Sequence, residues 1–282
     1  MKRNLRQLVP GPVKFALRRG SEILAEQWDK VNRRQDPLVP PASLMFVGGG
    51  RRNFRQVGDN WVQTFVRVAG LQPNESVLEV GCGVGRMAVA LTRFLSPAAR
   101  YEGFDIVREG IDWCQRAINS RFPNFGFRHS DLYNHEYNPA GRDQASEYRF
   151  PYANDSFDFV FLTSVFTHML PDEVRHYLRE VHRVLKPGGR CLITFFLMNP
   201  ESQKLVKAGA AGARSFEDDL GGYWVVDPQH PEAAVAFPEQ SVREFYREAD
   251  LAIREPLLYG VWCGRERQLT DHSQDIVLAT KS

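Results

Sequence analysis

The stretch that decides the fold is Val77-Leu78-Glu79-Val80-Gly81-Cys82-Gly83-Val84-Gly85-Arg86. A short apolar segment, 76–80, leads into three glycines at alternate positions, and apolar residues with helical spacing follow over 86–95. Glycines let a backbone approach a ligand closely, and a helix that follows such a turn offers free N–H groups. A dinucleotide site requires G-x-G-x-x-G, whereas the third glycine here comes one residue early, at Gly85. The turn therefore favours a ligand other than a dinucleotide.

Strand-like and helix-like segments alternate around this turn. The predicted strands are short and apolar, and the predicted helices carry apolar residues on one side. Such alternation predicts an α/β domain built on a parallel sheet with helices on both faces. The predicted strands are 76–80, 100–104, 125–129, 157–163, 190–196, 251–262 and 274–281, and the predicted helices are 53–69, 86–95, 110–119, 171–185 and 239–250.

Three regions depart from this alternation. Residues 1–69 are predicted to form a basic N-terminal helical extension and linker ahead of a domain over 70–282. Residues 1–19 contain six Lys or Arg and no acidic residue. Two interpretations of them stay open, weak peripheral contact with an anionic membrane surface and a solvated terminus that packs on the domain. Residues 132–149 and 198–238 are long connections, which are often functional, so we expect acceptor-binding and lid insertions there.

The glycine turn resembles a known family motif. Glu79-Val80-Gly81-Cys82-Gly83-Val84-Gly85 is similar to the E/D-x-G-x-G-x-G motif of class I S-adenosylmethionine-dependent methyltransferases. Segments 103–106, 130–132, 150–158 and 184–189 agree with this family in order and spacing, so the resemblance covers roughly residues 70–200. It implies a Rossmann-like, doubly wound sheet of about seven strands, mostly parallel with an antiparallel closing strand. It also implies S-adenosylmethionine as cofactor and S-adenosylhomocysteine as product.

The resemblance also assigns roles at the cofactor. It places Asp105 on the two ribose hydroxyls, and a carboxylate can accept hydrogen bonds from both. It places Asp131 on the adenine amino group and the Leu132 backbone on the adenine ring. Arg86 has two interpretations, neutralising the cofactor carboxylate or capping the loop. The expected cofactor-binding residues are Glu79, Gly81, Cys82, Gly83, Gly85, Arg86, Asp105, Ile106, Asp131, Leu132, Thr163 and Ser164.

The candidate catalytic residue is His168. It lies just beyond the predicted strand 157–163, and open α/β sheets build their sites at the carboxyl ends of strands. A hydroxyl or amine acceptor gains from a base that removes its proton. The alternative is a structural histidine that shapes the pocket. Candidate acceptor contacts come from the two insertions, namely Tyr133, Tyr137, Tyr223 and Trp224, with His135, Asn138 and His230 beside them.

These residues lead to one function and two alternatives. The leading prediction is O-methylation of a small-molecule, glycan or lipid-linked acceptor. The alternatives are N-methylation of a small amine and a non-catalytic S-adenosylmethionine-binding scaffold. An open pocket that reaches the methyl group would favour an enzyme, whereas a pocket filled by the chain's own side chains would favour a scaffold.

Composition limits the partners. The net charge of +2 predicts no particular partner. No nucleic acid is expected, because Asn/Asp-Pro-Pro-Tyr is absent after the fourth predicted strand and no basic stripe with aromatics occurs outside the N-terminal region. No metal is expected, since His168 and Asp172 alone do not make a site. The four cysteines are far apart and predict free thiols in a reducing cytoplasm. The oligomeric state stays open.

Overall fold

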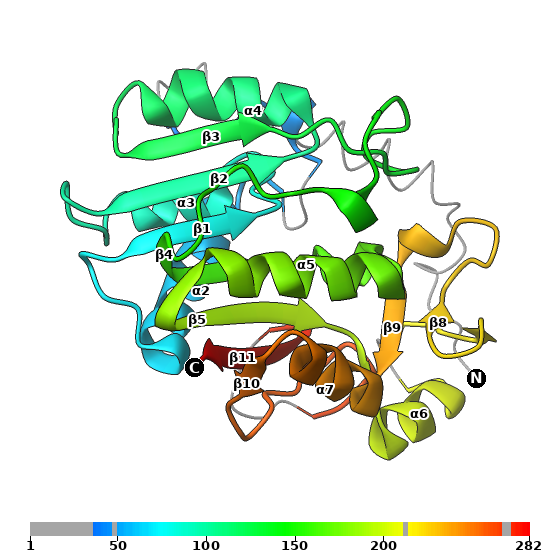
Figure 1. The fold of residues 1–282 in the computed structure, drawn as a ribbon. Coiled ribbons are helices and arrows are strands. Elements are labelled where there is room, and N and C mark those ends of the chain that lie inside the picture. Colours follow the sequence, from blue (N-terminus) through cyan, green and yellow to red (C-terminus); the bar gives the residue numbers. More distant parts are fainter. Residues whose placement is uncertain (1–35, 47–49, 211–213, 267–271) are drawn as a thin grey trace.

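The protein is described by a computed structural model, which covers residues 36–46, 50–210, 214–266 and 272–282. The predictions for residues 1–19 therefore lie outside the described residues. A seven-stranded sheet forms the centre of the fold, in the order β10-β11-β5-β4-β1-β2-β3 (Figure 1). Its strands are β1 (Ser76–Val80), β2 (Arg100–Asp105), β3 (Phe125–His129), β4 (Phe157–Leu162), β5 (Leu185–Phe195), β10 (Leu251–Ile253) and β11 (Asp275–Lys281).

The strand directions confirm the predicted doubly wound sheet. The five strands from β3 to β5 are mutually parallel. Strand β11 is antiparallel to both of its neighbours, β5 and β10. The chain runs outward from β1 to β3 and then crosses to β4 on the other side of β1. Such a reversal of strand order opens a crevice at the carboxyl ends of the strands, where open α/β sheets bind their ligands.

Helices cover both faces of the sheet because side chains alternate along each strand. In β4, Phe159 and Phe161 pack in one buried cluster and Val160 and Leu162 in the other. The first cluster holds residues of α2 (Phe54–Ala69), α3 (Arg86–Leu91) and α4 (Arg108–Cys114), and α4 continues into a π-turn (Gln115–Asn119). The second holds residues of α5 (Pro171–Val184) and α7 (Glu239–Glu248).

Helix α2 precedes the predicted domain start at residue 70 but shares the domain's core. Its Phe54 and Phe65 side chains are fully buried. Gly58 in α2 approaches α3 so closely that an added Cβ would lie 2.7 Å from the Arg86 carbonyl oxygen. The division at residue 70 stays a prediction. None of the helices in the described part of the chain combines the length and apolarity that crossing a bilayer requires.

The described residues of the predicted insertion 198–238 contribute most of a second, smaller sheet. This sheet has the order β6-β9-β8-β7 and lies at the edge where the parallel strands end (Figure 1). Phe196, Phe216 and Trp262 pack into a separate apolar cluster at this sheet. Short 3₁₀ turns occur at Ala42–Leu44, Ala145–Glu147, Phe166–His168 and Pro231–Ala233. The strand that leads into the insertion is β6 (Leu197–Met198). The insertion then forms α6 (Pro200–Lys207), β7 (Asp218–Asp219), β8 (Trp224–Val225) and β9 (Val235–Pro238).

Three predicted elements differ from those observed by more than two residues at one end. The predicted strand 251–262 stops at Ile253, and Pro256, which has no N–H to donate, follows shortly after. Strand β5 begins at Leu185 rather than Arg190, with a register shift opposite Phe157 and Phe159. Helix α3 ends at Leu91 instead of Leu95. The bounds of β1 and β3 are as predicted.

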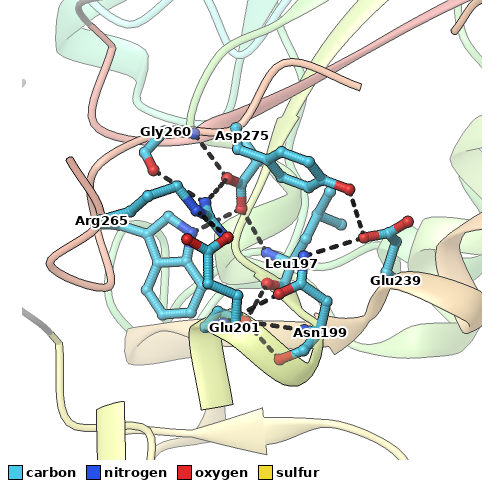
Figure 2. Close-up of polar contacts among 10 residues, drawn as sticks. Leu197, Asn199, Glu201, Glu239, Gly260, Arg265 and Asp275 are labelled. Carbon is cyan, nitrogen blue, oxygen red and sulfur yellow. Dashed lines mark hydrogen bonds and ion pairs between the residues drawn. The ribbon is translucent and has the colours of Figure 1, made fainter. Parts of the chain in front are cut away.

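A buried polar cluster joins the small sheet to the large one (Figure 2). The Asp275 carboxylate at the start of β11 accepts hydrogen bonds from the Leu197 N–H at 2.7 Å, the Gly260 N–H at 2.7 Å and the Trp262 indole N–H at 2.6 Å. Arg265 lies 3.5 Å from Asp275 and 2.7 Å from Glu201 on α6. Burial raises the pKa of Asp275 to about 6. The cluster therefore fixes where the lid leaves the sheet.

Candidate functional site

A cavity of about 360 Å³ opens at the carboxyl ends of β1, β2 and β4. This volume is within the range of small-molecule sites, about 300–1,000 Å³. Its walls come from the glycine turn, the loops after β2 and β4, and both insertions. Predicted site residues that line it are Gly81, Cys82, Gly83, Arg86, Asp105, Ile106, Leu132, Tyr133, Tyr137, Thr163, Ser164 and His168.

The glycine turn follows β1 and has a backbone that favours glycine. Gly81, Gly83 and Gly85 have φ angles of 77°, 54° and 70°. A Cβ on Gly81 would overlap Cγ2 of Val165 in the loop after β4. One on Gly85 would lie 2.5 Å from Cδ1 of Ile118. The turn therefore comes close to the next loop across the crevice and leaves its own side of the cavity open.

Asp105 ends β2 and holds the glycine turn in place. Its Oδ2 accepts a hydrogen bond from the Gly83 N–H at 2.6 Å, and its Oδ1 accepts one from the Val107 N–H at 2.8 Å. A carboxylate has about four lone-pair sites, so acceptor capacity remains for two hydroxyl groups. Because Asp105 lines the cavity, this geometry fits the ribose of S-adenosylmethionine. Burial raises the pKa of Asp105, and the backbone hydrogen bonds oppose that rise.

Glu79 lies beneath the turn and outside the lining of the cavity. It is fully buried and accepts a hydrogen bond from the Tyr101 hydroxyl. Its Oε1 has no hydrogen-bond partner among the described residues. Burial raises the pKa of Glu79 to about 8. The side chain is therefore mainly protonated at neutral pH and supports the turn from below.

Two further ionisable residues, Arg86 and Glu173, line the cavity. Arg86 lies beside the glycine turn, with its guanidinium over the Phe54 ring at 5.6 Å. Its two interpretations, neutralising a cofactor carboxylate and capping the loop, both stay predictions. Glu173 accepts a hydrogen bond from the Leu170 N–H at 2.7 Å, and burial raises the pKa of Glu173.

The two residues predicted to contact the adenine, Asp131 and Leu132, differ in their position relative to the cavity. Leu132 is buried and lines the cavity. Asp131 is not among the lining residues, and its Oδ2 instead lies 2.5 Å from Arg142 Nε. That ion pair lowers the pKa of Asp131. The assignment of Asp131 to the adenine amino group stays a prediction.

The loop after β4 brings His168 to the cavity. His168 ends a 3₁₀ turn, Phe166–His168, and its Nδ1 lies 2.9 Å from the Glu232 carbonyl oxygen. The Tyr137 ring meets the imidazole edge-on, with centroids 5.5 Å apart. Burial lowers the pKa of His168. Ser164 in the same loop has a φ of 60°, a backbone conformation that is uncommon outside glycine and often found at functional sites.

The four predicted acceptor residues separate into two pairs. Tyr133 and Tyr137 line the cavity. Tyr223 packs against Phe237, with ring centroids 6.4 Å apart, and Trp224 packs against the small sheet's cluster. Neither Tyr223 nor Trp224 is among the described lining residues.

Besides Asn134 and Tyr177, three polar lining residues escaped the sequence analysis: Glu173, Arg214 and Gln274. Gln274 accepts a hydrogen bond from the Ser164 hydroxyl at 3.0 Å, although the two are 110 residues apart. The Arg214 guanidinium lies over the Phe196 ring at 5.1 Å. No local motif surrounds any of the three. Among the described residues, no group of three or more His, Cys, Asp or Glu side chains could hold a metal ion.

Comparisons with known proteins agree with this geometry. Residues 78–193 match the family model described as a methyltransferase domain. A phthiotriol/phenolphthiotriol dimycocerosates methyltransferase of Mycobacterium ulcerans is 40% identical over 118 residues, 42% of this chain and 36% of the relative. A demethylmenaquinone methyltransferase of Halalkalibacterium halodurans is 29% identical over 137 residues, 48% of this chain and 49% of the relative. The chain thus spans half or less of these relatives.

A solved structure shows the same fold over most of the chain. The crystal structure of a SAM dependent methyltransferase from Aquifex aeolicus superposes with a TM-score of 0.53. The match covers 88% of this chain and 100% of that one, at 16% identity. The strand order, the glycine turn and the family match agree. Residues 78–193 therefore match a methyltransferase domain, and the described residues share the fold of a solved S-adenosylmethionine-dependent methyltransferase.

Proposed function

We propose that the chain transfers a methyl group from S-adenosylmethionine to a hydroxyl group of a small-molecule, glycan or lipid-linked acceptor. The observation that carries this proposal is the hydrogen bond of His168 in the cavity, which determines the tautomer of the imidazole ring. Its Nδ1 faces a backbone carbonyl at 2.9 Å and must donate to it. In a neutral imidazole the other nitrogen, Nε2, is then an acceptor. Because burial lowers the pKa of His168, the ring is neutral at pH 7.

A neutral histidine in this tautomer suits a general base. The hydrogen bond to the Glu232 carbonyl fixes the ring orientation, and the free Nε2 can take the proton of an acceptor hydroxyl. The Tyr137 ring, edge-on to the imidazole, limits how that ring can turn. Proton removal of this kind contributes about 10²–10⁴-fold to a rate.

The remaining residues of the cavity serve binding and alignment. S-adenosylmethionine, when bound, supplies the methyl group on a sulfonium centre. Gly81 and Gly83 leave room for the cofactor, Asp105 accepts from its ribose, and Arg86 faces its carboxylate. The acceptor enters from the insertion side, where Tyr133 and Tyr137 line the cavity. Holding two reactants in line is the larger part of such catalysis.

The comparisons support the acceptor class. One relative's name denotes a triol, an acceptor that carries hydroxyl groups, and another denotes demethylmenaquinone. Aromatic and apolar lining residues fit an apolar acceptor body, with Phe46, Phe196 and Met169 among them. Because the chain spans half or less of these relatives, the acceptor itself is part of the proposal.

The test is a screen of acceptor extracts with isotopically labelled methyl donor, followed by variants of two histidines. His168→Ala should lower turnover by about 10²–10⁴-fold without changing S-adenosylhomocysteine affinity. His176→Ala is the matched control, because His176 also bonds a carbonyl, that of Tyr148 at 2.8 Å, but lies outside the cavity lining. It should leave turnover unchanged.

Three outcomes would contradict parts of the proposal. Turnover of His168→Ala within a few-fold of the parent would reject His168 as the base. Label found on nitrogen in the product would replace O-methylation by N-methylation. Cofactor binding without transfer to any extract would favour the scaffold alternative.

A further inference from the structure

We propose that Glu232 is a positioning residue that fastens the insertion 132–149 to the lid 198–238 and holds His168 in its working tautomer. Glu232 lies in the 3₁₀ turn Pro231–Ala233 of the lid. Its side chain and its main chain bond different segments on the acceptor side of the cavity. The role in catalysis rests on the proposed function, whereas the fastening itself does not.

The side chain of Glu232 bonds the insertion. Its Oε2 accepts hydrogen bonds from Asn134 Nδ2 at 2.9 Å and from the His135 N–H at 2.8 Å. One carboxylate oxygen can accept both. Hydrogen bonds to an ionised acceptor are roughly twice as strong as neutral ones. The carboxylate therefore links two segments that are nearly 100 residues apart in the chain.

Asn134 connects Glu232 to a segment that lines the cavity. While its amide nitrogen donates to Glu232, its Oδ1 accepts from the N–H groups of Glu136 at 3.1 Å and Tyr137 at 3.0 Å. This local turn sets the position of Tyr137, whose ring meets His168 edge-on. Both Asn134 and Tyr137 line the cavity.

The main chain of Glu232 bonds His168 directly. Its carbonyl oxygen accepts from His168 Nδ1 at 2.9 Å. The turn that presents this carbonyl is held by the Ala233 N–H, which donates to the His230 carbonyl at 3.0 Å. His168 is thus fixed on one side by the backbone of Glu232 and on the other by Tyr137, which the Glu232 side chain positions through Asn134.

A second contact joins the same two segments. The rings of His135 and His230 stack with centroids 4.5 Å apart. His230 Nδ1 also lies 3.0 Å from Asp227 Oδ2 within the lid. This contact is more exposed than the Glu232 link, because the His230 side chain is 46% exposed. Glu232 is therefore the better residue to substitute in order to disrupt the contact between the two segments.

Four variants separate the effect of the hydrogen bonds from that of the charge and from that of any substitution in the lid. Glu232→Ala removes the acceptor of both insertion donors. Glu232→Gln keeps a carbonyl oxygen that can accept from both, so it should retain the joint. Glu217→Ala is the matched control, because Glu217 lies on the same lid, is exposed, and makes no side-chain hydrogen bond to another described residue. Asn134→Asp removes the donor on the other side and places two carboxylates together.

The experiment measures amide hydrogen exchange over residues 133–138 and the ¹⁵N signals of His168, on the full chain with S-adenosylhomocysteine. In the parent, the NMR signals should show Nδ1 protonated and Nε2 unprotonated. Glu232→Ala and Asn134→Asp should raise exchange by about tenfold to a hundredfold, as expected for losing hydrogen bonds to a charged group. Both should also give mixed tautomers, while Glu232→Gln and Glu217→Ala should resemble the parent.

The outcomes decide the proposal without relying on turnover. If Glu232→Ala folds and keeps both parental exchange and the single tautomer, the proposal is wrong. If that variant does not fold, Asn134→Asp with parental exchange would reject it equally. Faster exchange and mixed tautomers, found in a chain whose His168→Ala variant keeps full turnover, would support the fastening and reject only the role of His168 as base.

Discussion

Substituting Gly81 by Ala would test the close approach of the glycine turn to the loop after β4. The turn residue has a φ of 77°, and an added Cβ would overlap Val165 Cγ2. The left-handed backbone costs an alanine about 1–2 kcal/mol. The steric overlap adds about 1–3 kcal/mol. Gly81→Ala should therefore lower the free energy of unfolding by about 2–5 kcal/mol.

Gly70 provides the control. It has a φ of 65°, but nothing lies within 4 Å of an added Cβ. Gly70→Ala should therefore cost only the backbone contribution, about 1–2 kcal/mol. Val165→Ala removes the overlapping methyl group, so the double variant with Gly81→Ala should recover about 1–3 kcal/mol of coupling.

Urea unfolding of the four variants gives these free energies, and calorimetric titration gives their affinity for S-adenosylhomocysteine. Because Gly81 lines the cavity and Gly70 does not, Gly81→Ala should weaken binding and Gly70→Ala should leave it unchanged. If both glycine variants are equally destabilised and Val165→Ala gives no recovery, the two loops do not meet as described.

The remaining predictions concern three buried carboxyl groups. The pKa of Glu79 is raised to about 8 in the fold, so the native state holds a proton that the unfolded state releases, and stability falls as pH rises toward 8. Glu79→Gln should remove this part of the decline, about 1 kcal/mol per pH unit between pH 5.5 and 7.5 in urea unfolding, and parallel curves would refute it. Asp275→Asn should cost about 3–5 kcal/mol because Arg265 then lacks a buried partner, whereas Asp172→Asn at an exposed pair should cost less than about 1 kcal/mol; equal losses would contradict the cluster's role. Asp105→Ala should weaken S-adenosylhomocysteine by about 10²–10⁴-fold, and calorimetry showing a change below threefold would remove Asp105 from the ribose.

The large sheet could be predicted because its signals are local. The strands β1 and β3 are short apolar segments that end at a glycine turn or a polar residue, and their bounds agree with the prediction. The cofactor end of the cavity was predictable for the same reason. The glycine turn and Asp105 each follow directly from a strand, and parallel strands end at one edge of the sheet.

The acceptor side of the cavity could not be predicted from local sequence patterns. The strands β6, β7 and β8 have two residues each, too few to show alternation. Aromatic composition suggested Tyr223 and Trp224 as acceptor contacts; both pack on apolar clusters outside the cavity lining, so this assignment stays a prediction. Gln274 reaches the cavity from just before the antiparallel strand β11, where only the sheet order brings it near Ser164.

The most direct test of the account is a calorimetric titration of S-adenosylhomocysteine into the full chain. We predict saturable binding at one site per chain in the micromolar range, weakened by Gly81→Ala and Asp105→Ala and unchanged by Gly70→Ala. A folded protein that shows no binding heat at high micromolar concentration, by this and by a competition measurement with labelled S-adenosylmethionine, would contradict the central claim.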